Sequence, residues 1–432
     1  MNYKIFNFFL WLVTITSFYE LTVADQAAII DDFDDGINDI LFEIPIQEIQ
    51  DNAILQEFDE QREAIIEAEE LLATGDHLEL TEDELKANEI FMGHKLRELS
   101  QGFENPENFA AAKHFFQAKD LIEQSYVFKI IQQMPKGGNL HAHNSATVSS
   151  QWVVANLTYM PGMLRCINKN NLPTYSFRKN PEKHMCSLSD YVNVAEERAK
   201  AISQVEFDKD LEKDINLYTP QPEIEYNNIE KVWTKFQNMF DTIGDILAYH
   251  PAYRTFHWRM LEELYEDNVM YAEIRTKFKS LYGDDGSSIT TQETIELLLK
   301  VVEEFKATHP GFIGIKVIWA TARIADKKKI LKQFEEFKHW HALYPNFIVG
   351  FDLVGQEDKG KSLHTFIDVL QDMPKTAYFF FHAGETNWYN TASDLNLVDA
   401  ILMNTKRIGH GYALLKHPKL QEKVKSLGIA IE

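Results

Sequence analysis

Two histidines separated by one residue are the first candidates for chemistry in this sequence. His141 and His143 flank Ala142. Side chains of a strand alternate between its faces, so both imidazoles point to the same side if this segment is extended. Imidazole nitrogens are common zinc ligands. A His-x-His pair also arises by chance, so further ligands are needed before it predicts a metal site.

Three later motifs could complete such a site. The segment 381–385 reads FHAGE, in which His382 adds a third imidazole and Glu385 adds a carboxyl group able to exchange protons with a substrate or a metal-bound water. The segment 407–411 reads RIGHG and places His410 between two glycines, where it could orient an attacking water. The segment 350–355 reads GFDLVG, and Gly355 leaves its backbone open to a planar ligand. Any one of these histidines has a competing explanation, which is packing in the core.

The motifs fall on an alternation of short apolar strands and longer amphipathic helices, which is typical of parallel βα units. We expect seven strands, at residues 139–141, 269–274, 314–319, 347–353, 378–382, 407–409 and 429–431. This order favours an α/β fold of the TIM-type (β/α)8 barrel over a doubly wound sheet. Each motif lies at the carboxyl end of a different strand, where barrel enzymes place their active sites. That joint placement favours function over packing.

The N-terminal 24 residues have the pattern of a signal peptide. Lys4 precedes an apolar run over 5–15, and small residues at 22–24 offer a cleavage site. The run is short for a membrane span. We therefore expect a secreted, extracellular protein without a membrane span, the alternative being a retained anchor.

Residues 25–134 form a predicted acidic leader and helical region. The leader is rich in aspartate, helical periodicity begins near Glu57, and 81–84 (TEDE) reads as a capping box before a second helix. A third helical stretch is expected over 110–133. Helices that precede every strand suit dimerisation or packing.

Composition excludes some partners. The chain has 432 residues, 45% of them hydrophobic, and a formal net charge of −23. A large core is therefore possible, and binding to nucleic acid through the overall field is disfavoured, because that requires a positive surface.

Residues 157–225 interrupt the βα rhythm of the predicted barrel over 135–432, so we assign them as an insertion after the first strand. Cys166 and Cys186 lie within it and are the only cysteines. In an oxidising compartment they are expected to form a disulfide that ties the insertion, the alternative being two buried thiols. Asn156 begins an N-x-T glycosylation sequon just before it.

The motifs LHAH (140–143), VGFDLVG (349–355), HAGE (382–385) and RIGHG (407–411) together resemble the adenosine deaminase family. The segments ELYEDNV (263–269) and WTKF (233–236), with Leu80-Thr81 and Ala87-Asn88, resemble its secreted type 2 branch, the adenosine deaminase-related growth factors. The likeness covers residues from about 80 to 432.

The resemblance implies zinc-dependent deamination of adenosine, and of 2′-deoxyadenosine, to inosine and ammonia. It assigns one zinc per subunit to His141, His143 and His382, proton donation to Glu385 and the water-handling base to His410. Contacts with the substrate fall to a further set of residues: Asn144, Trp233, Phe236, Phe240 and Gly355. The N-terminal helices would form a homodimer, and the insertion would bind a cell-surface receptor or glycan.

The sequence departs from the family pattern in two places. Asn144 stands where the family has an acidic residue that helps to hold the ribose. The printed sequence ends at Glu432, before an eighth strand whose paired aspartates bind zinc and substrate in the family. We therefore expect a barrel that lacks its eighth strand, with poor zinc binding and little activity, unless the sequence is a fragment of a longer protein.

Two other functions remain open at this point. One is a non-catalytic secreted ligand that keeps the barrel and binds a receptor or glycan through the insertion, which the missing aspartates and Asn144 favour. The other is an AMP deaminase or another barrel hydrolase. The signal peptide and the lack of an obvious phosphate-binding motif count against AMP.

Overall fold

The computed structural model describes residues 53–75, 77–178, 186–386 and 389–432. The chain divides into two units, Asn2–Arg97 and Glu98–Glu432. The predicted signal peptide and most of the predicted acidic leader lie outside the described residues. Within the described ranges, every helix is too short or too polar to cross a bilayer.

The first unit contains α3 (Ala53–Glu70), and α4 (Glu82–Glu104) begins in it and continues into the second. The predicted capping box is confirmed. The Glu84 side chain accepts the Thr81 backbone N–H at 2.8 Å, and the Thr81 hydroxyl accepts the Glu84 N–H at 3.4 Å. These bonds satisfy amides that the first helical turn leaves without partners, so α4 begins where the sequence predicts.

The second unit opens with short helices. The stretch expected over 110–133 forms two α-helices, α5 (Phe115–Gln124) and α6 (Tyr126–Gln133), after two 3₁₀ turns, η1 (Pro106–Asn108) and η2 (Ala110–Ala112). Ser125 separates α5 from α6 because its hydroxyl accepts the Phe128 N–H at 3.0 Å and donates to Glu98 at 2.7 Å. A serine engaged in this way caps a new helix instead of continuing the old one.

The strands of the second unit lie close to the seven predicted positions, which confirms the α/β architecture with parallel strands. One parallel sheet has the order β1-β5-β8-β9-β10 and a second has the order β11-β12-β13. Their bounds are β1 Gly138–His143, β5 Tyr271–Thr276, β8 Gly314–Ala322, β9 Ile348–Val354, β10 Tyr378–Phe379, β11 His382–Ala383, β12 Arg407–His410 and β13 Ala430–Ile431.

The strand expected over 378–382 changes partners midway. β10 pairs with β9, whereas β11 pairs with β12. Phe380 and Phe381 join them: the Phe380 N–H donates to Phe351 O, and Phe381 O accepts the Gly409 N–H. One continuous segment therefore links the two sheets.

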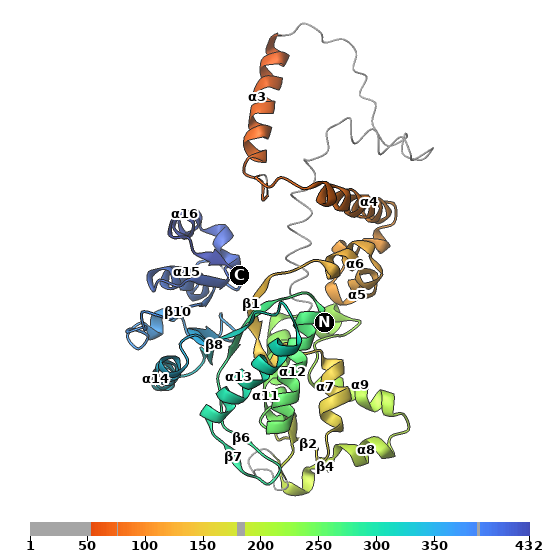
Figure 1. Ribbon diagram of the computed structural model, residues 1–432, viewed down its shortest axis with the longest axis vertical. Helices are drawn as coiled ribbons and strands as arrows, with labels where there is room; N and C mark the ends of the chain where they lie inside the picture. Colours follow the sequence, from red (N-terminus) through yellow and green to blue (C-terminus); the bar gives the residue numbers. More distant parts are fainter. Residues whose placement is uncertain (1–52, 76, 179–185, 387–388) are drawn as a thin grey trace. The chain divides into compact units, whose positions relative to one another are not determined.

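Long helices connect the strands and bury their apolar faces on the outside of the sheet (Figure 1). They are α12 His250–Glu266, α13 Thr291–Thr308, α14 Lys327–Leu343, α15 Ala392–Leu402 and α16 Pro418–Leu427. A further long helix, α11 Ile229–Ile246, packs against β3 (Pro173–Ser176), and its Ile243 and Ile246 lie in a second apolar core. Ile274, Val317 and Phe351 from the strands are completely buried against Leu261, Leu298 and Phe334 from the helices. This core fixes the strands whose carboxyl ends carry the predicted motifs. Smaller elements are η5 Leu188–Asp190, η6 Leu363–Phe366, η7 Tyr412–Lys416, β6 Leu281–Tyr282 and β7 Ser288–Ile289.

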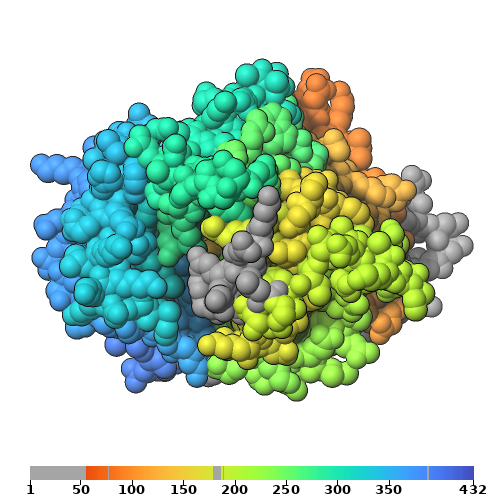
Figure 2. Space-filling view, turned by 90° about the horizontal axis from the view of Figure 1, so that it is seen from below, coloured from red at the N-terminus to blue at the C-terminus, as the bar shows by residue number. Residues whose placement is uncertain are grey.

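Between β1 and α11 the chain forms a separate subregion. It contains η3 Asn144–Ala146, α7 Ser150–Asn156, η4 Leu157–Tyr159, an antiparallel sheet of β2 Leu164–Ile167, β3 Pro173–Ser176 and β4 Val192–Asn193, and then α8 Val194–Lys200, α9 Gln204–Asp214 and α10 Pro222–Glu225. Cys166 and Cys186 are bonded to each other. The space-filling view shows this subregion, in yellow and light green, on the opposite side of the visible face from the blue C-terminal elements (Figure 2).

Candidate active site

Four histidines from three segments meet at the carboxyl ends of β1, β11 and β12. The ring centroids of His141 lie 5.4 Å from His143, 4.6 Å from His382 and 4.9 Å from His410. His143 is 5.2 Å from His382 by the same measure. Ligand atoms of His141, His382 and His410 all lie within 4.8 Å of one another, a spacing that could hold a metal ion. This set contains His410 in place of the predicted ligand His143, which the ring distances nevertheless place beside His141 and His382.

His382 is oriented by a buried aspartate on the neighbouring strand. Its Nδ1 donates to Asp352 Oδ2 at 2.6 Å, and its backbone N–H donates to Asp352 Oδ1 at 3.0 Å. Asp352 comes from the GFDLVG motif on β9 and is completely buried. A carboxylate on Nδ1 places the ring proton there and leaves the Nε2 lone pair for another ligand.

His141 is oriented in the same way by Glu432. Its Nδ1 donates to Glu432 Oε2 at 2.8 Å. Burial alone would raise the pKa of Glu432, but the His141 hydrogen bond and the charges of Arg275 and Arg407 lower it to about 2. Glu432 is therefore an anion at neutral pH and fixes the His141 proton on Nδ1.

The two Nε2 atoms then face each other at 3.1 Å. Burial lowers the pKa of both His141 and His382, so both rings are neutral at pH 7. With both ring protons held on Nδ1, two lone pairs point at one small space without a proton between them. This donor set fits a divalent metal ion, and imidazole nitrogen is a ligand that zinc prefers.

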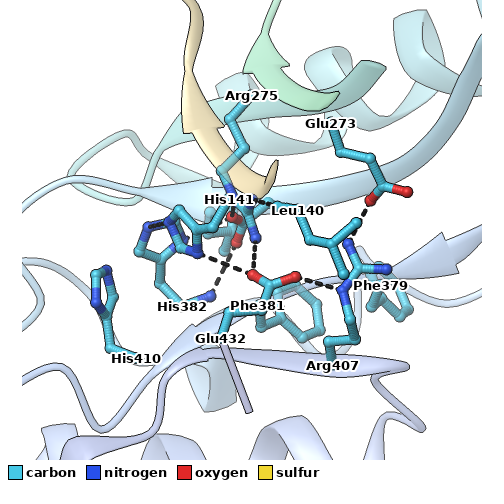
Figure 3. A network of polar contacts seen from close by, with 12 residues as sticks. Leu140, His141, Glu273, Arg275, Phe379, Phe381, His382, Arg407, His410 and Glu432 are labelled. Atoms are coloured by element: carbon cyan, nitrogen blue, oxygen red, sulfur yellow. Dashed lines mark hydrogen bonds and ion pairs between the residues drawn. The ribbon is translucent and has the colours of Figure 1, made fainter. Parts of the chain in front are cut away.

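Two arginines join the carboxylates behind the histidines into one network (Figure 3). Arg275 donates through Nε to Asp352 at 2.9 Å and through Nη2 to Glu432 at 2.5 Å. Arg407 pairs with both Glu432 and Glu273. Buried charges are costly unless they are paired, and this chain of alternating charges pairs each of them.

Glu385 and His410 lie next to the facing imidazoles. The His410 Nε2 is 3.5 Å from a Glu385 carboxylate oxygen, and 37% of the His410 side chain is exposed. Gly409 permits this approach of β12, since a Cβ there would lie 2.9 Å from the His141 ring. Sequence reasoning predicted both residues, and the structure brings them to the same site as the histidines.

Asn144 is turned toward α12. It is buried, and its Oδ1 lies 2.9 Å from His257 Nε2, while His257 Nδ1 lies 2.7 Å from the Tyr253 carbonyl oxygen. Burial lowers the pKa of His257 to about 4, so the ring is neutral and carries a single N–H. That N–H donates either to the Tyr253 carbonyl oxygen or to Asn144 Oδ1. Asn144 therefore lies against a buried neutral histidine.

The predicted substrate-lining aromatics form a line on α11. Ring centroids lie 5.5 Å apart for Trp233 and Phe236, 4.8 Å for Phe236 and Phe240, and 6.1 Å for Phe240 and His143. Gly355 follows β9 with φ +103°, and nothing lies within 4 Å of the place where a Cβ would be. The space beside it is open, as a backbone contact with a ligand would require.

The remaining predicted residues belong to the neighbouring subregion. Asn156 is exposed at the end of α7, whereas Thr158 of the same sequon is buried. Cys166 and Cys186 form the predicted disulfide.

Sequence reasoning missed the residues that orient the histidines. Asp352 stood inside a quoted motif, but only its glycine was assigned a role. Arg407 likewise stood inside the quoted motif RIGHG, but only its histidine was assigned a role. Glu432 and Arg275 gave no usable signal, because each is an ordinary charged residue in or after a short apolar strand. A charge that follows a buried strand is the one hint that could have found them.

Imidazoles at the carboxyl ends of parallel strands, with carboxylates behind them, are typical of metal-dependent α/β hydrolases. A family model described as "Adenosine deaminase" matches residues 211–432, and one described as "Adenosine/AMP deaminase N-terminal" matches 34–131. The chain belongs to the adenosine deaminase family and is a deaminase hydrolase, which confirms the resemblance predicted from the motifs.

The curated relatives that resemble this chain are also adenosine deaminases. The adenosine deaminase of Aedes albopictus is 39% identical over 380 residues, which cover 87% of this chain and 70% of the relative. Human adenosine deaminase 2 is 36% identical over 366 residues, which cover 84% and 71%. Among solved structures, the N6-mAMP deaminase of Arabidopsis aligns with 70% of this chain and 72% of its own at 16% identity, with a TM-score of 0.45.

Proposed function

We propose that this protein is a secreted, zinc-dependent adenosine deaminase that converts adenosine, and 2′-deoxyadenosine, to inosine or deoxyinosine and ammonia. The facing Nε2 atoms of His141 and His382, 3.1 Å apart, carry the proposal. Family membership supports the reaction, and the names of the relatives support adenosine as the substrate.

In this proposal His141, His143 and His382 hold one zinc ion. When bound, zinc lowers the pKa of a water to about 7 and so provides a nucleophile at neutral pH. Asp352 and Glu432 keep the ring protons of His382 and His141 on Nδ1, so that both Nε2 atoms remain donors to the metal.

Glu385 and His410 handle the protons. The Glu385 carboxyl group donates a proton to N1 of the purine as water attacks C6, and His410 takes a proton from that water. His410 then returns its proton to the amino group at C6, the C6–N bond breaks and ammonia leaves. The hydroxyl proton at C6 passes back to Glu385, which leaves the carbonyl group of inosine. The 3.5 Å separation of the two side chains lets both reach the same reacting carbon.

Phe236, Phe240 and Trp233 would line the nucleoside, Gly355 would meet the purine through its backbone, and Asn144 would act near the ribose. We further propose that residues 135–432 form a (β/α)8-type barrel with 157–225 as a receptor- or glycan-binding insertion. The helical part of 25–134 would form a homodimer, Asn156 would be glycosylated, and the protein would have a growth-factor-like role outside the cell.

The reaction is tested by removing metal from the purified protein with a chelator, adding zinc back, and measuring inosine and ammonia formed from adenosine. AMP serves as a comparison substrate. For a protein that also carries the paired aspartates of the family, we expect zinc-dependent turnover of adenosine and little turnover of AMP. Stoichiometric zinc without turnover would contradict the catalytic proposal and favour the non-catalytic ligand.

The assignment of Glu385 is tested by Glu385→Gln. We expect kcat to fall by about 10²- to 10⁴-fold, the usual contribution of a general acid. Glu422→Gln, which changes an exposed glutamate of α16, is the matched control and should retain wild-type turnover.

A further inference from the structure

Glu357 lies just after the GFDLVG motif and has no role in the chemistry described so far. Its side chain is completely buried, yet it carries a carboxylate. Oε1 accepts the Gly384 backbone N–H at 3.0 Å and the Asn396 Nδ2 at 2.8 Å, and Oε2 accepts the Glu385 backbone N–H at 2.6 Å. One buried carboxylate therefore binds two consecutive amides of the segment that carries Glu385.

Arg323 holds the same segment from its carbonyl side. Its Nη2 donates to the His382 carbonyl oxygen at 2.6 Å and to the Leu353 carbonyl oxygen at 3.2 Å. Its Nη1 lies 3.7 Å from Glu357. The stem of Arg323 fits only because residue 360 is glycine, since a Cβ there would lie 2.6 Å from it.

The hydrogen bonds of this turn can be followed group by group. The His382 N–H goes to Asp352, and the carbonyls of Ala383 and Gly384 accept the N–H groups of Gly411 and Ala413. The amides of Gly384 and Glu385 go to Glu357. Buried backbone groups need partners, and in the described part of the chain a side chain, not a strand, provides the partner of these two.

We propose that Glu357, supported by Arg323, is a positioning residue that sets where the Glu385 carboxyl group stands. It acts through the backbone amide of Glu385 itself, without touching the substrate. This inference rests on the proposed role of Glu385 as proton donor.

The test begins with Glu357→Gln, which keeps the shape of the side chain but turns one acceptor into an NH2 that cannot accept an amide hydrogen. We expect faster hydrogen exchange at the amides of Gly384 and Glu385. We also expect kcat to fall by about 10- to 100-fold with KM changed by less than about threefold, since misplacement of a reacting group by about 1 Å costs up to about 10²-fold. Glu263→Gln is the matched control, because Glu263 is also buried and also accepts a backbone amide, that of Ser149. It should leave kcat and these two amides unchanged.

A double mutant separates positioning from general stability. If Glu357 acts through Glu385, Glu357→Gln should lower kcat by less than about twofold in the Glu385→Gln background, because coupled residues are not additive. An equal loss in both backgrounds, or unchanged exchange at residues 384 and 385, would overturn the proposal. If Glu357→Gln does not fold, Asn396→Ala removes one hydrogen bond to the same carboxylate. It should lower kcat and speed exchange at residues 384 and 385 by less than Glu357→Gln would. Unchanged kcat and unchanged exchange in Asn396→Ala would overturn the proposal.

Failure of the proposed function gives a different pattern. Glu385→Gln with wild-type turnover would remove the role of Glu385 in catalysis. The exchange of the amides at 384 and 385 would still show whether Glu357 holds the turn.

Discussion

The two strand ends that carry the facing imidazoles are held in different ways. β1 has six residues and pairs with β5 at Gly138–Asn139 and at Ala142–His143. The register shifts between these pairs, and there the His141 N–H donates to Asn139 Oδ1 and Arg275 donates to Leu140 O. Glu432 sets the direction of the His141 ring. β11 has two residues, and the chain then turns through Gly384 at φ +65°. Asp352, Arg323 and Glu357 bind the backbone there, and Asp352 also binds the His382 ring.

The difference shows what a short strand requires. The longer ladder of β1 satisfies part of its backbone and leaves the His141 N–H and the Leu140 carbonyl, at its register shift, to side chains. The two-residue strand β11 leaves more of its amides and carbonyls to be satisfied by side chains. Ionised side chains make stronger hydrogen bonds than neutral ones, but they must be paired with each other when they are buried. Removing a charged group should therefore disturb the β11 end more than removing a neutral group disturbs the β1 end.

The largest expected effect is at the β11 end itself. His382→Ala removes one of the two facing Nε2 donors and should abolish tight zinc binding, as measured by competition with a chromophoric chelator. His341→Ala is the matched control, because His341 is also buried, with its ring nitrogens near Ile348 O and the Thr376 hydroxyl. It should lower thermal stability and leave zinc affinity unchanged. Tight zinc binding by His382→Ala would show that His382 is not a zinc ligand and would contradict the proposed metal site.

The next effect concerns His257, the buried imidazole on α12 that contacts Asn144. His257 has a folded pKa of about 4, lowered by burial, against about 6.5 in the unfolded chain. The unfolded state thus binds more protons between these values, so the contribution to stability is full above pH 6.5 and is lost as pH falls through 4. That contribution is about 3 kcal/mol.

Urea unfolding at pH 7 and pH 4 of the wild type and of His257→Gln measures it. We expect the wild type to lose about 3 kcal/mol more than the variant. If the wild type and His257→Gln lose the same free energy of unfolding between pH 7 and pH 4, His257 does not contribute to the pH dependence in this way. Asn144→Asp should reduce the difference, because a carboxylate at residue 144 would stabilise the protonated ring.

Removing the charge of Asp352 should weaken zinc binding by about 10- to 100-fold, the usual effect of losing a residue that orients a metal ligand. Asp352→Asn keeps the volume but leaves Arg275 and the His382 Nδ1–H with a weaker acceptor. Asp399→Asn is the control. Asp399 is a buried aspartate on α15, and it accepts a hydrogen bond from the backbone N–H of His364. Equal zinc affinities for the two variants would mean that Asp352 has no more influence on zinc binding than a buried aspartate that does not contact His382.

The sequence predicted the elements of the α/β region with its parallel strands, and the residues with distinctive chemistry. Strand positions followed from short apolar runs, and His141, His382, Glu385 and His410 followed from motif and placement at strand ends. The orienting residues could not be found, because Glu357 and Glu432 are recognisable only from distant partners, such as Glu385 and His141. The partner change within 378–383 and the cap at Ser125 likewise depend on contacts that spacing does not reveal.

The smallest expected effect belongs to the β1 end, where Phe240 packs its ring 6.1 Å from that of His143. Phe240→Leu keeps an apolar side chain of similar volume, so the fold and the metal ligands should persist. The loss of a flat ring beside the nucleoside should raise KM for adenosine by about 2- to 10-fold with kcat nearly unchanged, as expected from an aromatic contact of about 0.5–1.5 kcal/mol. Steady-state kinetics measure both constants, and Phe337→Leu, in the core against Phe351, is the control expected to change stability and leave KM unchanged. A fall in kcat with constant KM would instead mean that α11 acts on His143. In that case the ladder of β1 would not be sufficient to place its own histidine.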